Sequence, residues 1–158
     1  MEKINTLLNL ITAISAVIAA YIASKTLSNS VSQQKQALER EKKQATLEAY
    51  NKLQEQVLDP INAISPHEIK SIIKDGQSND AKQLGGYLAR IEHFCVGLET
   101  GIYDYDTFYK LAHGYFDSSV LKNRLVPILE RKLNYAKEDY YANLHAVWTK
   151  MKTGSNNK

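Results

Sequence analysis

Two glutamates seven residues apart are the residues of this sequence best placed to do chemistry. Glu92 and Glu99 lie on one flank of an apolar stripe on a predicted helix, and Arg90 and His93 lie on the other flank. Two carboxylates on one face could serve acid–base catalysis or bind a metal. An enzyme that uses Glu92 and Glu99 is therefore one hypothesis for the function.

The more common role of such glutamates is structural. A glutamate at the border of a core usually accepts a hydrogen bond or salt bridge from a neighbouring helix, here from Arg124 or Arg131. We expect His93 at the surface and Cys95, the only cysteine, as a small core hydrophobe. The sequence has no Gly-rich phosphate loop, G-x-S-x-G, H-E-x-x-H or C-x-x-C motif. We therefore expect no catalytic residue, metal site or cofactor.

Tyrosines offer a second kind of candidate surface, because the chain has ten of them. Most should be half-buried between helices, but Tyr103 and Tyr105 flank a predicted loop and are expected to be exposed. Asp104 lies between them. The candidate residues for a protein-interaction surface are therefore Arg90, Glu92, His93, Glu99, Tyr103, Asp104 and Tyr105.

Helices must position these residues, because no stretch alternates with period two for long enough to form a strand. Apolar residues at helical spacing from residue 45 onward predict a packed helix that stops at Asp59-Pro60. A short helix follows. Ser65-Pro66-His67-Glu68 has the pattern of its N-terminus, and Gly76 is expected to end it.

The next predicted helix has the clearest apolar stripe, with Asp80 at its start and Gly101 as its C-cap. Asp104 should cap a short helix that Gly114 closes. Residues 115–133 and 140–151 are predicted to be helical as well, which makes the class all-α.

The N-terminal segment has the length and composition of a membrane span. No charged residue occurs from Ile4 to Ser24, and Lys3 and Lys25 bracket the run. The run Leu7 to Ala23 would cover about 26 Å as a helix, and extension to Lys25 matches a hydrocarbon core of about 30 Å. A cleaved signal peptide fits poorly, because the run is too long and no A-x-A site follows it. A helix that packs in a soluble bundle or assembly is the other alternative.

This segment has two different faces when it is drawn as a helix. Large aliphatic residues share one side, and small residues share the other. Helices associate in lipid through small residues and interhelical hydrogen bonds, so the second face favours self-association. The residues expected to mediate it are Asn9, Thr12, Ala16 and Ala20.

The predicted organisation is a transmembrane anchor (1–27), a helical stalk (28–44), an α-helical cytosolic domain that forms a small bundle (45–152) and a disordered tail (153–158). Cations are concentrated after the span, at Lys25, Lys35, Arg40, Lys42 and Lys43. This places the C-terminal domain in the cytosol of a cell with the span in its inner membrane. The net charge of +3 is too small and dispersed to indicate a nucleic-acid partner.

Several segments resemble a known family. They are Ala45–Glu48, Tyr87–His93, Gly101–Asp104, Val126–Arg131 and the closing aromatic helix through Trp148. Together they are similar to the bacterial domain-of-unknown-function family 4760, although the family more often has asparagine where Ala89 stands. The resemblance implies a small membrane-anchored helical protein of bacteria or prophages, and it implies no reaction.

These observations favour a single-pass membrane protein that works by protein–protein interaction, as a homo-oligomer with a further protein partner whose identity the sequence does not give. A role in host–phage conflict is a hypothesis that follows from the family's setting. A membrane-perturbing, pore-type effector is the main alternative, and the enzyme is the third.

Overall fold

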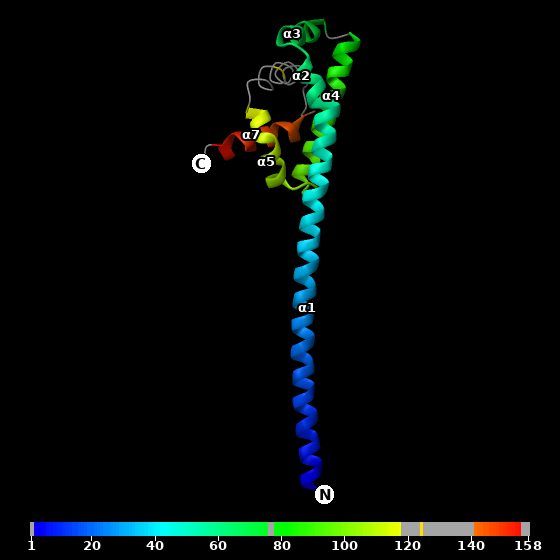
Figure 1. The fold of residues 1–158 in the computed structure, drawn as a ribbon, viewed down its shortest axis with the longest axis vertical. Coiled ribbons are helices and arrows are strands. Elements are labelled where there is room, and N and C mark those ends of the chain that lie inside the picture. The colour runs from blue at the N-terminus through cyan, green and yellow to red at the C-terminus, as the bar shows by residue number, and fades with distance from the viewer. Residues whose placement is uncertain (1, 76–77, 118–123, 125–140, 156–158) are drawn as a thin grey trace. The chain divides into compact units, whose positions relative to one another are not determined.

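The computed structural model describes residues 2–75, 78–117, 124 and 141–155. All elements in these ranges are helical (Figure 1). No strand occurs among these residues, which confirms the predicted all-α class for the described part of the chain. The chain divides into two compact units, Met1–Glu41 and Lys42–Lys158.

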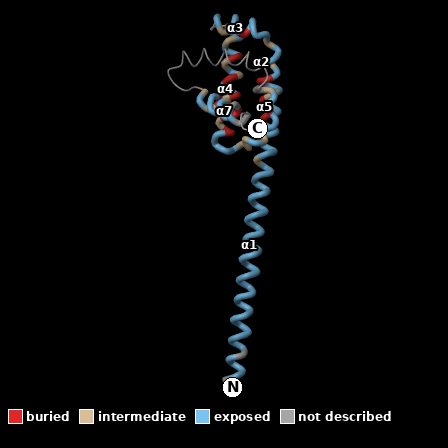
Figure 2. The backbone as a smooth tube through the Cα atoms, turned by 90° about the vertical axis from the view of Figure 1, so that its left-hand side faces the viewer, coloured by how far each residue is buried: buried red, intermediate tan, exposed pale blue. Residues whose placement is uncertain are grey.

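The first unit consists of the N-terminal part of helix α1, which spans Glu2–Leu53. The residues of this first unit whose exposure is described are all exposed (Figure 2). Within the described residues, one helix is sufficiently long and apolar for a membrane crossing, as judged from length and composition, and its apolar window is not buried. The predicted long apolar helix is therefore present.

In the second unit, the helical backbone continues through Pro60, so the predicted stop at Asp59-Pro60 is wrong. After α1 comes a π-helical turn, η1 (Gln54–Leu58), and then α2 (Asp59–Ala63). The N–H of Asp59 donates to the carbonyl of Gln54, five residues earlier. Pro60 follows this wide turn in the first turn of α2, where a missing N–H costs little.

Helix α3 spans Pro66–Asp75, and its predicted N-terminus is confirmed. The hydroxyl of Ser65 accepts a hydrogen bond from the N–H of Glu68 at 3.2 Å. Pro66 occupies the first helical position, where its fixed φ suits the helix. Gly76, the predicted end, lies outside the described residues.

Helix α4 spans Asn79–Glu99. Its N-cap is Ser78, whose hydroxyl accepts from the N–H of Ala81 at 3.2 Å, and Asp80 lies in the first turn. Gly101 follows the helix with a φ of 75°, as predicted for a C-cap glycine.

Helix α5 spans Tyr105–Asp117. Asp104 caps it as predicted, because its Oδ1 accepts from the N–H of Thr107 at 2.8 Å. Gly114 does not end the helix. A glycine inside a helix costs only about 1 kcal/mol, and the next residue, Tyr115, is half-buried and donates its hydroxyl to the carbonyl of Leu58 at 3.0 Å. The rest of the helix predicted over 115–133 lies outside the described residues, except for Arg124.

Helix α7 spans Ala142–Ser155 and corresponds to the predicted closing helix. It continues to Ser155, so the first three residues of the predicted tail are helical. The Thr153 hydroxyl donates to the Lys150 carbonyl at 3.0 Å within this last part. Residues 156–158 lie outside the described ranges.

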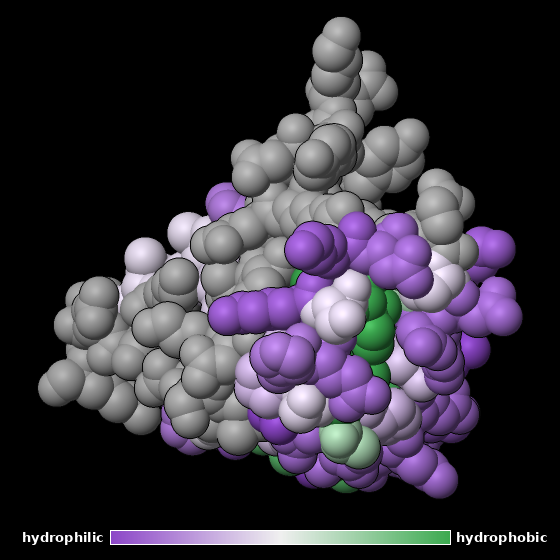
Figure 3. Space-filling view, turned by 90° about the horizontal axis from the view of Figure 1, so that it is seen from above, coloured by the Kyte–Doolittle hydropathy of each residue, from purple (hydrophilic) through white to green (hydrophobic). Residues whose placement is uncertain are grey.

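The core of the second unit is centred on α4, which packs against α7, α3 and η1. Figure 2 marks the buried positions of these helices in red along the backbone. Those of α4 are Leu84, Leu88, Ile91, Phe94, Cys95 and Leu98. On the face in Figure 3 the described residues are mainly hydrophilic. The exposed large apolar residues described in this unit are Leu47, Ile102 and Leu111.

Candidate functional site

Glu92, the first of the candidate glutamates, caps helix α7. One carboxylate oxygen accepts from the backbone N–H of Asn143 at 3.1 Å and from its side-chain amide at 2.8 Å. The other oxygen accepts from the N–H of Leu144 at 2.7 Å. The first N–H groups of a helix have no partner within the helix, and a negative charge is favourable there. The half-buried Glu92 therefore fixes the start of α7 against α4.

The other charged candidates on α4 do not share this environment. Glu99 is exposed in the last turn, about 10 Å from Glu92 along the helix by helical rise. Arg90 and His93 are exposed, as expected for His93. The donors to Glu92 come from α7, whereas the Nε of Arg124 donates to the carbonyl of Ile64 at 2.7 Å. Arg131 lies outside the described residues.

No group of three or more His, Cys, Asp and Glu side chains that could hold a metal occurs in the described part of the chain. Cys95 is buried on α4, as expected for a core hydrophobe. Burial raises the pKa of its thiol, and the negative charges of Glu92 and Glu99 add to the effect. The thiol therefore remains protonated and unreactive at neutral pH.

The expectation that Tyr103 is exposed is wrong. Its ring stacks on Phe94, with centroids 5.1 Å apart and planes 22° apart. The N–H of Tyr103 donates to the carbonyl of Gly97 at 2.9 Å, so the chain turns back onto α4 directly after Gly101. A Cβ on Gly97 would overlap the Tyr103 ring. The missing side chain at Gly97 thus makes room for the tyrosine.

The expectation that Tyr105 is exposed is wrong as well. Tyr105 is half-buried, and Lys150 of α7 lies with its Nζ 4.0 Å from the ring centroid. Its hydroxyl oxygen is buried and has no hydrogen-bond partner among the described residues. Burial raises the pKa of Tyr105 to about 12, with smaller contributions from Tyr109, Glu99 and Asp106.

Thr46 contacts the candidate residue Asp104, and the sequence analysis did not select it. It is fully buried on α1, and its hydroxyl donates to the carbonyl of Lys42 and accepts from the N–H of Asp104, both at 2.7 Å. The sequence offers one signal of its burial, because Thr46 lies on the same side of the helix as Tyr50 and Leu53.

Asp104 therefore links two elements. Its N–H bonds Thr46 of α1, and its carboxylate accepts from the Thr107 hydroxyl at 2.6 Å at the start of α5. The hydrogen bond from this hydroxyl lowers the pKa of Asp104, and burial partly opposes it. The Thr107 N–H, Lys43 and Lys42 lower the pKa further.

The candidate residues of the N-terminal helix are exposed on α1 in the first unit. They are Asn9, Thr12, Ala16 and Ala20. The hydroxyl of Thr12 donates to the carbonyl of Leu8 at 2.9 Å, so its hydrogen is already bonded within the helix. Large apolar residues such as Ile14 and Val17 are also exposed, by 52% and 70%.

No family model matches the chain, and no curated protein or solved structure is similar enough to it to count as a match. The resemblance to family 4760 stays a prediction from the sequence segments. The apolar face of α1, rather than the α4 carboxylates, is the surface on which a functional hypothesis can be built.

Proposed function

We propose that this chain is a single-pass protein of the bacterial inner membrane that acts by binding other proteins. The observation that carries the proposal is the exposure of every described large aliphatic side chain from Ile4 to Ile22. Each of them is more than half exposed on α1. An apolar surface of this extent is unfavourable in water, whereas a bilayer covers it at little cost.

The distribution of cations supports one orientation of the span. Lys25 and Lys35 lie within about 20 residues of its C-terminal end, as do three more cations up to Lys43. Lys3 is the cation at the opposite end. The domain that follows α1 is therefore cytosolic in this proposal.

Self-association through the face of small residues is part of the same proposal. A span confines the domain to two dimensions and raises its effective concentration for a membrane partner, so weak contacts suffice for binding. This is the mechanism that we propose for the protein. The proposed role in host–phage conflict depends only on the resemblance to family 4760.

Two other functions make different predictions. In a pore, the face that bears Asn9 would line a water-filled channel, and polar substitutions at Ala16 or Ala20 would change ion leakage. In an enzyme, Glu92 would need a free carboxylate, but both of its oxygens bind the start of α7. That contact argues against a catalytic role for Glu92.

Alkaline carbonate extraction of membranes tests the proposal. We expect the full chain to stay in the membrane pellet and a truncation that starts at Ser28 to appear in the supernatant. Circular dichroism of the truncated protein serves as the control that its helices are still formed. Release of the full chain into the supernatant would mean that α1 packs in a soluble assembly, and both the tethering and the pore functions would be wrong.

A further inference from the structure

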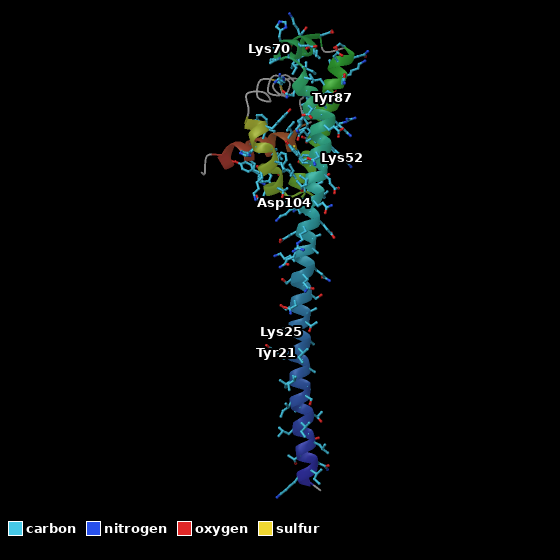
Figure 4. The ribbon with its side chains drawn as sticks, viewed as in Figure 1. Tyr21, Lys25, Lys52, Lys70, Tyr87 and Asp104 are labelled. Atoms are coloured by element: carbon cyan, nitrogen blue, oxygen red, sulfur yellow. The ribbon has the colours of Figure 1, made fainter. Side chains whose placement is uncertain are left out.

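Two lysines and a tyrosine lie on one side of α1 at the ends of its aliphatic face. At about 100° per residue, Lys3 and Tyr21 have the same angular position, and Lys25 lies about 40° away. Tyr21 is 67% exposed, and Figure 4 shows it next to Lys25, one turn apart on α1. The large aliphatic residues on the same side are Leu10, Ile14, Val17 and Ile18.

The spacing of these residues matches the thickness of a bilayer. Lys3 and Lys25 are 22 positions apart, or about 33 Å along a helix, against about 30 Å of hydrocarbon. Tyrosine rings prefer the headgroup level, and lysines extend along the apolar surface until the ammonium reaches it. Each lysine would thus lie at the phosphate layer of one leaflet.

The opposite side of α1 has a different character. It carries Asn9, Thr12, Ala16 and Ala20, and no charged residue occurs from Ile4 to Ser24. The proposed self-association uses this side, so a second copy would cover it. The side with Lys3, Tyr21 and Lys25 would then remain in contact with lipid.

Lys25 has fewer carboxylates near it than Lys3 has. Along the helix, the first carboxylate after it is Glu39, about 21 Å away, which exceeds a Debye length of about 8–10 Å. The Thr26 hydroxyl, next to Lys25, donates to the carbonyl of Ile22 at 2.9 Å. Lys3, by contrast, directly follows Glu2 in the sequence. The charge of Lys25 is therefore the less neutralised.

We propose that the face of α1 marked by Lys3, Tyr21 and Lys25 is a binding face for anionic phospholipid, with Lys25 as its main contact. The ammonium of Lys25 binds the headgroup phosphate, and the hydroxyl of Tyr21 donates to the same group. This inference rests on the proposed membrane anchor and adds the class of lipid and the face that contacts it.

Lipid retention tests the inference on the full chain. The protein is reconstituted into nanodiscs with equal amounts of phosphatidylcholine and phosphatidylglycerol, and native mass spectrometry in detergent counts the lipids that stay bound. We expect phosphatidylglycerol to be enriched, and Lys25→Gln to reduce the enrichment about fivefold. Lys25→Arg keeps the charge and should retain it. Lys3→Gln, next to Glu2, should have the smaller effect.

A relocated cation tests whether the face matters. The double variant Ala23→Lys/Lys25→Gln keeps one lysine within about 3 Å of the same depth but moves it by about 160°, to the side of Thr12 and Ala16. We expect no recovery of the enrichment. Recovery in this variant, or unchanged enrichment in Lys25→Gln, would overturn the inference.

Carbonate extraction of the same proteins tests the proposed membrane anchor separately. If the full chain is released by carbonate, the membrane anchor itself is wrong. If it stays in the membrane but retains both lipids equally, only the lipid-binding face is wrong.

Discussion

Tyr105 and Tyr115 lie on the same helix, but their hydroxyls have opposite surroundings. The Tyr115 hydroxyl donates to the carbonyl of Leu58 at 3.0 Å. The Tyr105 hydroxyl is buried without a hydrogen-bond partner in the described part of the chain, and the pKa of Tyr105 is raised to about 12. Removal of the Tyr115 hydroxyl should thus cost a hydrogen bond, and removal of the Tyr105 hydroxyl should not.

The pH dependence of stability tests the surroundings of the Tyr105 hydroxyl. A folded pKa of about 12 for Tyr105 exceeds the unfolded value of about 10. Its contribution to stability is therefore complete below about pH 10 and is lost as the pH rises through 12. We expect Tyr105→Phe to keep or raise the free energy of unfolding at neutral pH and to weaken its alkaline decline.

Urea titrations of the full chain in detergent, followed by the fluorescence of Trp148, measure this effect. The matched variant Tyr115→Phe should lower the free energy of unfolding by about 1 kcal/mol at neutral pH. Equal losses at neutral pH in the two variants would show that the Tyr105 hydroxyl has a partner after all.

The carboxylate of Glu92 on α4 accepts hydrogen bonds from the start of helix α7. We expect Glu92→Ala to lower the free energy of unfolding by about 1–3 kcal/mol, because three donors at the start of α7 lose their acceptor. Glu99→Ala removes the same side chain from an exposed site on the same helix and should change it by at most about 0.5 kcal/mol. Trp148 fluorescence in urea reports both variants, and similar values for the two would argue against the cap.

The helix ends that the sequence predicted correctly depend on neighbouring residues. Ser65 bonds the N–H three residues later, and so does Asp104. Gly101 adopts the positive φ that its place after the apolar stripe predicts. Such signals lie within one turn of the helix and are readable from the residue types.

The contacts that the sequence did not predict join residues far apart in the chain. Glu92 binds residues 51 and 52 positions away, and Thr46 binds Asp104 at a separation of 58. No local pattern encodes such pairs. The π-helical turn before Pro60 was also missed, because a proline usually indicates the end of a helix and nothing nearby showed that a wider turn would accommodate it.

Across the whole molecule, a polar-surfaced helical domain follows α1, whose first part, Ile4 to Ser24, has exposed aliphatic side chains and no charge. The proposed self-association through α1 predicts that bulk on the small-residue face weakens it. We expect Ala16→Ile/Ala20→Ile to lower disulfide crosslinking of Ser24→Cys chains in membranes severalfold, because close backbone approach is lost. Ile18→Leu on the aliphatic face is the control and should leave crosslinking unchanged.

The double variant and the Ile18→Leu control should both still insert into the membrane. The alanine-to-isoleucine changes add hydrophobicity. Undiminished crosslinking in the double variant would mean that the copies meet through another face or not at all. A change in ion leakage on polar substitution at Ala16 would instead favour the pore.

Cys95 has a practical consequence for all such experiments. The chain's only native thiol is 1% exposed and stays protonated at neutral pH. A maleimide added to intact cells or inverted vesicles would therefore leave the parent protein unlabelled. Each cysteine introduced one at a time along α1 and the domain would be the sole reporter of which side of the bilayer it faces, without prior removal of a native residue from the core.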